Sequence, residues 1–120
     1  MADAKPTLLI AKGVMSRMGG AERDLLRRLP HLTNWYDVSV ATLSSCFELE
    51  SICEQHEIKL YKPEKDWTPP QSSISQIFDS VHKSSKNSWL SCKSLISNID
   101  SFDYFHVISG DGYLAMLQLI

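Results

Sequence analysis

The sequence predicts an α/β fold in which helices cover both faces of a parallel sheet, giving a three-layer α/β/α sandwich. Short apolar runs typical of buried strands alternate along the chain with segments whose apolar residues recur at helical spacing. Such alternation favours parallel strands joined by right-handed crossovers, with the strand order 3-2-1-4. The 120 residues, of which 43% are hydrophobic and 22% charged, suffice for one core, so we expect a single domain over residues 1–120.

The first strand and the first helix are predicted within residues 7–32. Residues 7–11 form an apolar run after Pro6, which indicates a central strand buried on both faces. A helix is expected to begin near Gly19 and Gly20, because the leucines that follow share one apolar stripe, formed by Leu25, Leu26, Leu29 and Leu32. Pro30 is expected to limit this helix.

The second and third strands are predicted in the middle of the chain. Residues 36–43 alternate and are rich in β-forming side chains, residues 47–56 carry the apolar positions of a helix, and residues 58–61 read as a short strand. Residues 63–71 contain Pro63, Pro69 and Pro70 and are expected to form an exposed surface loop. Trp67 in this loop is expected either to tuck over the sheet edge or to contact a sugar or a partner domain.

The last third of the chain predicts more helix and a fourth strand. Residues 72–98 are rich in serine, yet their large apolar residues recur at helical spacing, which favours one or two helices interrupted near Ser84 and Ser85 over a flexible linker. Residues 104–108 predict a buried fourth strand, followed by a turn and the start of a helix within 113–120. Because that last segment is almost wholly apolar, we expect it to need more of its own chain or a partner to cover it.

Charge and cysteine content exclude several classes of protein. The formal net charge of −2 provides no general positive field, so no nucleic-acid partner is expected. The three cysteines, Cys46, Cys53 and Cys92, form no C-x-x-C pair and share no stretch with clustered histidines, so neither a disulfide framework nor a metal site is expected. The apolar runs are too short to span a membrane, and a reduced, cytoplasmic protein is expected.

The glycine pair between the first strand and the first helix is the main candidate for function. Glycine lets a ligand approach the main chain, and the free N–H groups at a helix start favour phosphate or other anions. The alternative is a turn that only needs positive φ. The spacing from Gly13 to Gly20 does not supply G-x-G-x-x-G, and Glu22 partly opposes a bare phosphate, so a nicotinamide dehydrogenase is disfavoured.

Residues 18–23, Met-Gly-Gly-Ala-Glu-Arg, resemble the G-G-A-E-R segment of family 4 glycosyltransferases, which follows the first strand of the N-terminal Rossmann-like domain of the GT-B fold. Residues 36–43, 48–60 and 102–115 resemble the later strands and helices of that domain. The resemblance implies a retaining transferase that moves a sugar from a nucleotide-sugar donor to an acceptor, with no metal and no cofactor beyond the donor itself. This chain would be the acceptor-side domain, inactive without its C-terminal donor-binding domain.

The resemblance also implies site residues. Gly19 and Gly20 would lie against the donor phosphates, and Arg17 would contact phosphate or acceptor unless it is a solvated surface residue. His106 matches the first position of the family's H-x-H-like pair, but Ile108 stands at the second, so His106 is either an acceptor contact or a buried strand residue. Two residues of the following turn would bind acceptor hydroxyls, Asp111 being alternatively a helix N-cap: Ser109 and Asp111. No catalytic residue is assigned.

The expected partners follow from the same resemblance. They are the missing C-terminal domain or a partner chain, and a sugar or lipid-linked acceptor, which would place the protein in the cytoplasm or at the inner face of the membrane. One alternative is a non-catalytic Rossmann-like interaction module, or half of a split GT-B enzyme, that docks a second chain or forms a homodimer through residues 113–120. A flavodoxin-like ligand binder with a purely structural glycine turn is a further alternative.

Overall fold

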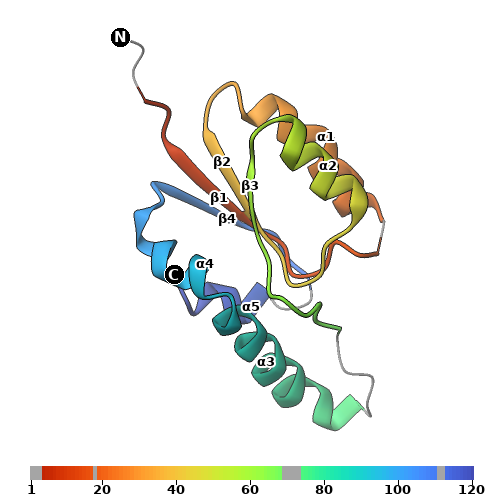
Figure 1. The fold of residues 1–120 in the computed structure, drawn as a ribbon. Coiled ribbons are helices and arrows are strands. Elements are labelled where there is room, and N and C mark those ends of the chain that lie inside the picture. The colour runs from red at the N-terminus through yellow and green to blue at the C-terminus, as the bar shows by residue number, and fades with distance from the viewer. Residues whose placement is uncertain (1–3, 18, 69–73, 111–112) are drawn as a thin grey trace.

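The structure, a computed structural model, describes residues 4–17, 19–68, 74–110 and 113–120 (Figure 1). Its centre is a four-stranded parallel sheet with the order β3-β2-β1-β4. The strands are β1 (Thr7–Ala11), β2 (Asp37–Ala41), β3 (Lys59–Tyr61) and β4 (Tyr104–Val107). The helices are α1 (Gly20–Leu32), α2 (Phe47–Gln55), α3 (Ile74–Ser91), α4 (Lys93–Asn98) with the 3₁₀ turn η1 (Ile99–Ser101), and α5 (Tyr113–Leu117). The predicted Rossmann-like α/β/α fold and its strand order are confirmed.

Alternate residues of β1 face two separate cores. Leu8 and Ile10 pack with apolar residues of α1 and α2, including Leu29 and Leu49. Leu9 and Ala11 pack on the opposite side with residues of α3, α4 and α5, namely Trp89, Leu95, Ala115 and Met116. Because side chains alternate across a strand, the continuous apolar run of β1 is what allows helices to cover both faces. Figure 1 shows the two groups of helices on opposite sides of the strands.

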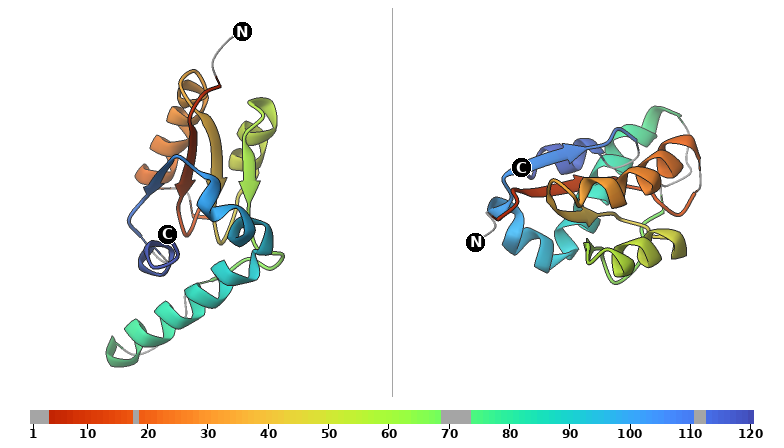
Figure 2. Two further views of the ribbon diagram at one scale, coloured as in Figure 1. Left: turned by 90° about the vertical axis from the view of Figure 1, so that its left-hand side faces the viewer. Right: turned by 90° about the horizontal axis from the view of Figure 1, so that it is seen from above.

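The helical segment after β3 differs from the sequence prediction. The predicted interruption at Ser84 and Ser85 is wrong, because α3 runs through both residues and ends at Ser91, and the chain leaves helical geometry at Cys92, where ψ is 80°. Ser85 is buried, so its small side chain serves helix packing rather than a break. Figure 2 shows the first turns of α3 extending away from the sheet.

The described part of the loop after β3 is mostly exposed, as predicted, and its buried residues are Pro63 and Trp67. Trp67 is buried, with only 7% of its surface accessible. Its backbone N–H donates to the Leu43 carbonyl at 3.0 Å, and its indole N–H donates to Ser84 Oγ at 2.8 Å. Trp67 therefore closes the core between the end of β2 and α3, in agreement with the expectation that it lies over the sheet.

Pro30 does not end α1, which continues for two residues to Leu32. A proline in the last turn removes only one helical hydrogen bond. The chain compensates just beyond it, because the Thr33 N–H donates to the Leu29 carbonyl and the Thr33 hydroxyl donates to the Pro30 carbonyl at 2.6 Å.

Strand β4 is not buried as predicted. Among the described strands it pairs only with β1, so it is an edge strand, and Tyr104 and Phe105 are exposed by 57% and 37%. The segment after it is half covered: Ala115 and Met116 of α5 are buried, whereas Leu114 and Leu117 remain exposed. The predicted order 3-2-1-4 already places this strand at an edge, which the structure confirms, but the apolar pattern of residues 104–108 does not show that its side chains stay exposed there.

Candidate functional site

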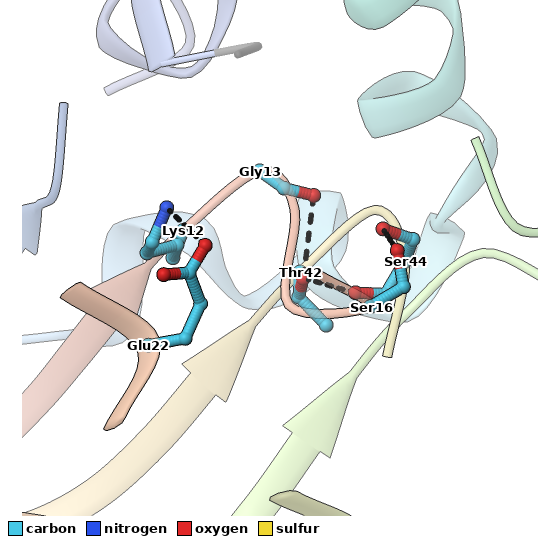
Figure 3. Close-up of polar contacts among 6 residues, drawn as sticks. All are labelled: Lys12, Gly13, Ser16, Glu22, Thr42 and Ser44. Carbon is cyan, nitrogen blue, oxygen red and sulfur yellow. Dashed lines mark hydrogen bonds and ion pairs between the residues drawn. The ribbon is translucent and has the colours of Figure 1, made fainter. Parts of the chain in front are cut away.

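The candidate site lies at the carboxyl-terminal edge of the sheet, where the loops after β1, β2 and β4 meet the start of α1 (Figure 3). Ligands of open α/β sheets bind at this edge. The loop after β1 is fixed to the end of β2 by several bonds. The Gly13 carbonyl accepts from the Leu43 N–H at 3.0 Å, and the buried Thr42 hydroxyl donates to the carbonyls of Ser44 and Gly13 at 3.0 and 3.3 Å.

The bonding between these two loops continues toward the surface. The Met15 N–H donates to the Ser44 carbonyl at 2.9 Å, and the hydroxyls of Ser16 and Ser44 lie 3.0 Å apart. These hydrogen bonds fix residues 12–16, called the platform below, against the loop that follows β2.

The glycine pair forms an open helix start. Gly19 is the N-cap with φ −121° and ψ −164°, and no side chain caps the helix. The first helical bond joins the Arg23 N–H to the Gly19 carbonyl at 3.1 Å, so the amides of Gly20, Ala21 and Glu22 have no acceptor within the helix. Both glycines are exposed.

The backbone geometry does not explain why these two residues are glycine. Neither has positive φ, which excludes the turn that only needs a left-handed residue. A Cβ placed on Gly20 would meet no described atom within 4 Å. The open space beside Gly20 is room for an approaching ligand.

A buried ion pair lies beside this helix start and was missed by the sequence analysis. Lys12, the residue directly after β1, has a side chain only 7% exposed, and its Nζ lies 3.8 Å from Oε1 of Glu22, whose side chain is 14% exposed. Figure 3 shows the two side chains turned toward each other at the end of β1. The sequence does contain a signal for this pair. A lysine directly follows a buried strand, and an acid stands ten residues later in the first turn of the next helix.

Gly110, in the loop after β4, closes over Lys12. Its φ of +144° is a conformation that side chains rarely adopt, and a Cβ there would lie 3.3 Å from Lys12 Nζ. Here, unlike at Gly20, backbone conformation and close approach both require glycine.

His106 lies in an apolar groove rather than in the core. It is exposed on β4 opposite Ile10, so the interpretation as a buried strand residue is wrong. The groove, of about 410 Å³, runs between α1 and β4, and Tyr104 and Tyr36 meet edge to face within its lining at 6.1 Å between ring centroids. Its lining reaches Ala21, so the groove adjoins the start of α1.

The remaining predicted site residues are peripheral. Arg17 and Ser109 are exposed on the loops of the same edge. Asp111 lies outside the described residues, so neither its acceptor role nor its N-cap role is addressed.

Metal and thiol chemistry find no support in the described part of the chain. No group of three or more metal-ligating side chains occurs among the residues that the structure describes. Burial raises the pKa of the Cys46 thiol and raises that of Cys53 to about 11, so neither is an activated nucleophile. None of the described helices is both long and apolar enough to cross a bilayer.

No protein-family model, curated protein or solved structure matches the chain. The structure shows a Rossmann-like α/β domain with an open helix start and a buried lysine at the sheet edge where such folds bind ligands. An apolar groove runs from this helix start along α1 to the amino end of the sheet.

Proposed function

We propose that this chain is the N-terminal, acceptor-binding part of a retaining glycosyltransferase that uses a nucleotide-sugar donor, and that it is inactive without a donor-binding domain. The observation that carries the proposal is the glycine pair at the start of α1. Gly20 presents free amides at the ligand-binding edge, and neither its φ nor any crowding requires glycine there. The resemblance of residues 18–23 to the G-G-A-E-R segment gives these amides a role.

The amides would act on the departing nucleoside diphosphate. Negative charge grows on the diphosphate oxygen as its bond to the sugar breaks, and fixed N–H dipoles at a helix start stabilise such charge without reorganising. The amides of Gly20 and Ala21 have no intrahelical acceptor and are available for this contact.

The groove between α1 and β4 would hold the acceptor. The rings of Tyr36 and Tyr104 offer apolar surface to a sugar or lipid-linked acceptor, and His106 and Asp24 supply polar groups in the same lining. The two rings lie near the amino end of β1 and the lining reaches Ala21 near its carboxyl end, so an extended acceptor that filled the groove would bring one end beside the diphosphate.

A substitution at Gly20 tests the proposal. In Gly20→Val the new side chain enters open space, so the chain should fold, but the approach of a phosphate to the amides is blocked. Titration of the labelled chain with inorganic pyrophosphate, followed by amide NMR, should shift the signals of Gly19 and Gly20 in the wild type and not the corresponding signals in Gly20→Val. Gln55→Val, at an exposed helix end distant in sequence, is the control.

Two results would contradict the proposal. One is pyrophosphate binding that is equal in the wild type and in Gly20→Val. The other is rapid sugar transfer or hydrolysis by the isolated chain with nucleotide sugars, because half of the site is proposed to lie elsewhere.

A non-catalytic interaction module, including half of a split enzyme, is the second candidate. It is favoured by the exposed apolar side chains of Phe105 on β4 and of Leu114 and Leu117 on α5. Sedimentation at increasing concentration tests it, since a stable dimer that Leu114→Glu dissociates would support docking through residues 113–120.

A further inference from the structure

The Lys12 side chain is largely buried, and its ammonium makes no hydrogen bond to a described residue. Its side chain is 7% exposed, and among the described residues its ionic partner is Glu22, at 3.8 Å, which is beyond hydrogen-bond distance. A lysine ammonium has three donors, and because no fully buried side-chain nitrogen among the described residues lacks a partner, the Lys12 nitrogen keeps some access to solvent. The pair is therefore a weak structural tie, and an anion that approached Lys12 more closely would replace it favourably.

Glu22 occupies the place that such an anion would take. It is the third residue of α1, so its carboxylate lies at the positive end of the helix dipole. One carboxylate oxygen faces Lys12 Nζ (Figure 3). The other lies 3.2 Å from the position of a Cβ on Gly19. The carboxylate thus stands between the buried cation and the exposed glycine pair.

The loop after β4 keeps Lys12 at this position. A Cβ on Gly110 would come within 3.3 Å of Nζ, so the main chain itself covers the ammonium on that side. With Gly110 on one side and Glu22 on another, exchange of the carboxylate for a ligand is the simplest way for Lys12 to gain a new acceptor.

We propose that Glu22 is an internal substitute for a phosphate group, and that a diphosphate-bearing ligand displaces it to bind Lys12 and the first amides of α1. Lys12 is then a ligand-binding residue, and Glu22 competes with the ligand for it. The inference rests on the proposed function because it concerns the same edge of the sheet. It goes further by assigning recognition of the diphosphate charge to Lys12, which lies outside the glycine pair.

Two substitutions act in opposite directions on this exchange. Glu22→Gln keeps the shape of the side chain and removes its charge, so inorganic pyrophosphate should bind about tenfold more tightly, because no carboxylate competes for Lys12. Lys12→Met keeps an unbranched side chain one atom shorter and removes the cation, so binding should weaken at least about tenfold. Each variant has a control with the same change in net charge at an exposed site: Glu54→Gln and Arg27→Met.

The experiment uses the full chain, labelled on its backbone amides and on the lysine side-chain carbons. Inorganic pyrophosphate is titrated into each variant, and the signals of Lys12 and of Gly19 and Gly20 are followed by NMR. Thermal unfolding confirms that each variant is folded. If Lys12→Met does not fold, Glu22→Gln decides alone, since it leaves the buried cation in place. A parallel titration with uridine diphosphate shows whether a nucleoside adds affinity to the diphosphate.

The outcomes separate this inference from the proposed function. Tighter binding in Glu22→Gln, with both controls within about twofold of the wild type, supports the exchange. The exchange is overturned if pyrophosphate shifts Gly20 while both variants bind like the wild type, or if Glu22→Gln shows no saturable binding. If Lys12 responds and Glu22→Gln tightens binding, but Gly20→Val binds normally, the exchange stands and the proposed function loses its main support.

Discussion

The two ends of β1 carry polar clusters of opposite character. At the amino end, Asp103 accepts from the N–H of Thr7 at 2.9 Å and from its hydroxyl at 3.2 Å, and the Asp103 N–H donates back to the Thr7 hydroxyl at 2.8 Å. At the carboxyl end, Lys12 faces Glu22 across 3.8 Å, and the first amides of α1 have no intrahelical acceptor. The first cluster is joined by several hydrogen bonds of ordinary length, whereas the side chains of the second are joined by an ion pair at 3.8 Å.

This difference distinguishes a structural cluster from a candidate site. Polar groups that satisfy one another tie strands together and offer little to a ligand. The same distinction holds within the carboxyl end, where the Thr42 hydroxyl is fully used by the carbonyls of Ser44 and Gly13, while Lys12 has donors to spare. The comparison predicts which substitutions affect stability and which affect binding.

The largest loss of stability is expected for Gly110→Ala. A side chain at φ +144° is strained, and the Cβ would press on Lys12, so the free energy of unfolding should fall by about 2 kcal/mol. Urea unfolding measures it, and pyrophosphate binding should weaken in the same variant because Lys12 is displaced. A variant as stable as the wild type would mean that Gly110 does not hold the carboxyl-end cluster.

Thr42→Val should cost about 1.5 kcal/mol of unfolding free energy, because a buried hydroxyl that makes two hydrogen bonds is replaced by a methyl group of similar size. Thr42→Ser keeps the hydroxyl and is the matched control. Urea unfolding of both variants tests whether the hydroxyl network fixes the loop after β1. Equal stability of the two would assign the effect to packing instead.

Asp103→Ala removes the acceptor at the amino end and should lower the unfolding free energy by about 1 kcal/mol, since the bonds are exposed. Pyrophosphate affinity should not change, because the cluster lies at the opposite end of β1. Urea unfolding and pyrophosphate titration of one preparation of this variant test the two expectations. A weaker affinity with unchanged stability would remove the distinction between the two ends.

Gly20→Ala is expected to have the smallest effect on stability and of opposite sign, a gain of about 0.5 kcal/mol, because alanine fits the open space and favours helix. The methyl group nevertheless narrows the approach to the amides, so pyrophosphate should bind more weakly. Differential scanning calorimetry combined with the titration measures the two effects. A loss of stability would show that the chain needs glycine there for its own fold.

The strands and their order could be predicted because they depend on local pattern and general chirality. The apolar run of residues 7–11 matches β1 at both ends, and alternation of strand and helix leads to the order 3-2-1-4. Features decided by distant contacts could not be predicted. Ser85 appears polar in the sequence, but its burial in α3 depends on how that helix lies against the sheet.

The candidate site was predicted only in part for the same reason. The glycine pair could be placed at the start of a helix from its position after an apolar run. Lys12, Glu22 and Gly110 come from three separate segments of the chain. Their proximity depends on how the strands pair, so the local sequence could not predict it. His106 was placed correctly in an edge strand, but its exposure depends on what covers that edge, which the local sequence does not determine.

Tryptophan fluorescence can report on the platform of residues 12–16, because Trp67 is bonded to the same hydrogen-bond network. Its backbone is bonded to Leu43, whose own N–H is bonded to Gly13, and its indole is bonded to α3. Trp67 and Trp89 are shielded from solvent, whereas Trp35 is 71% exposed. A soluble quencher should therefore extinguish Trp35 emission first, leaving a residual fluorescence that reports on the joint between the β1 loop and α3.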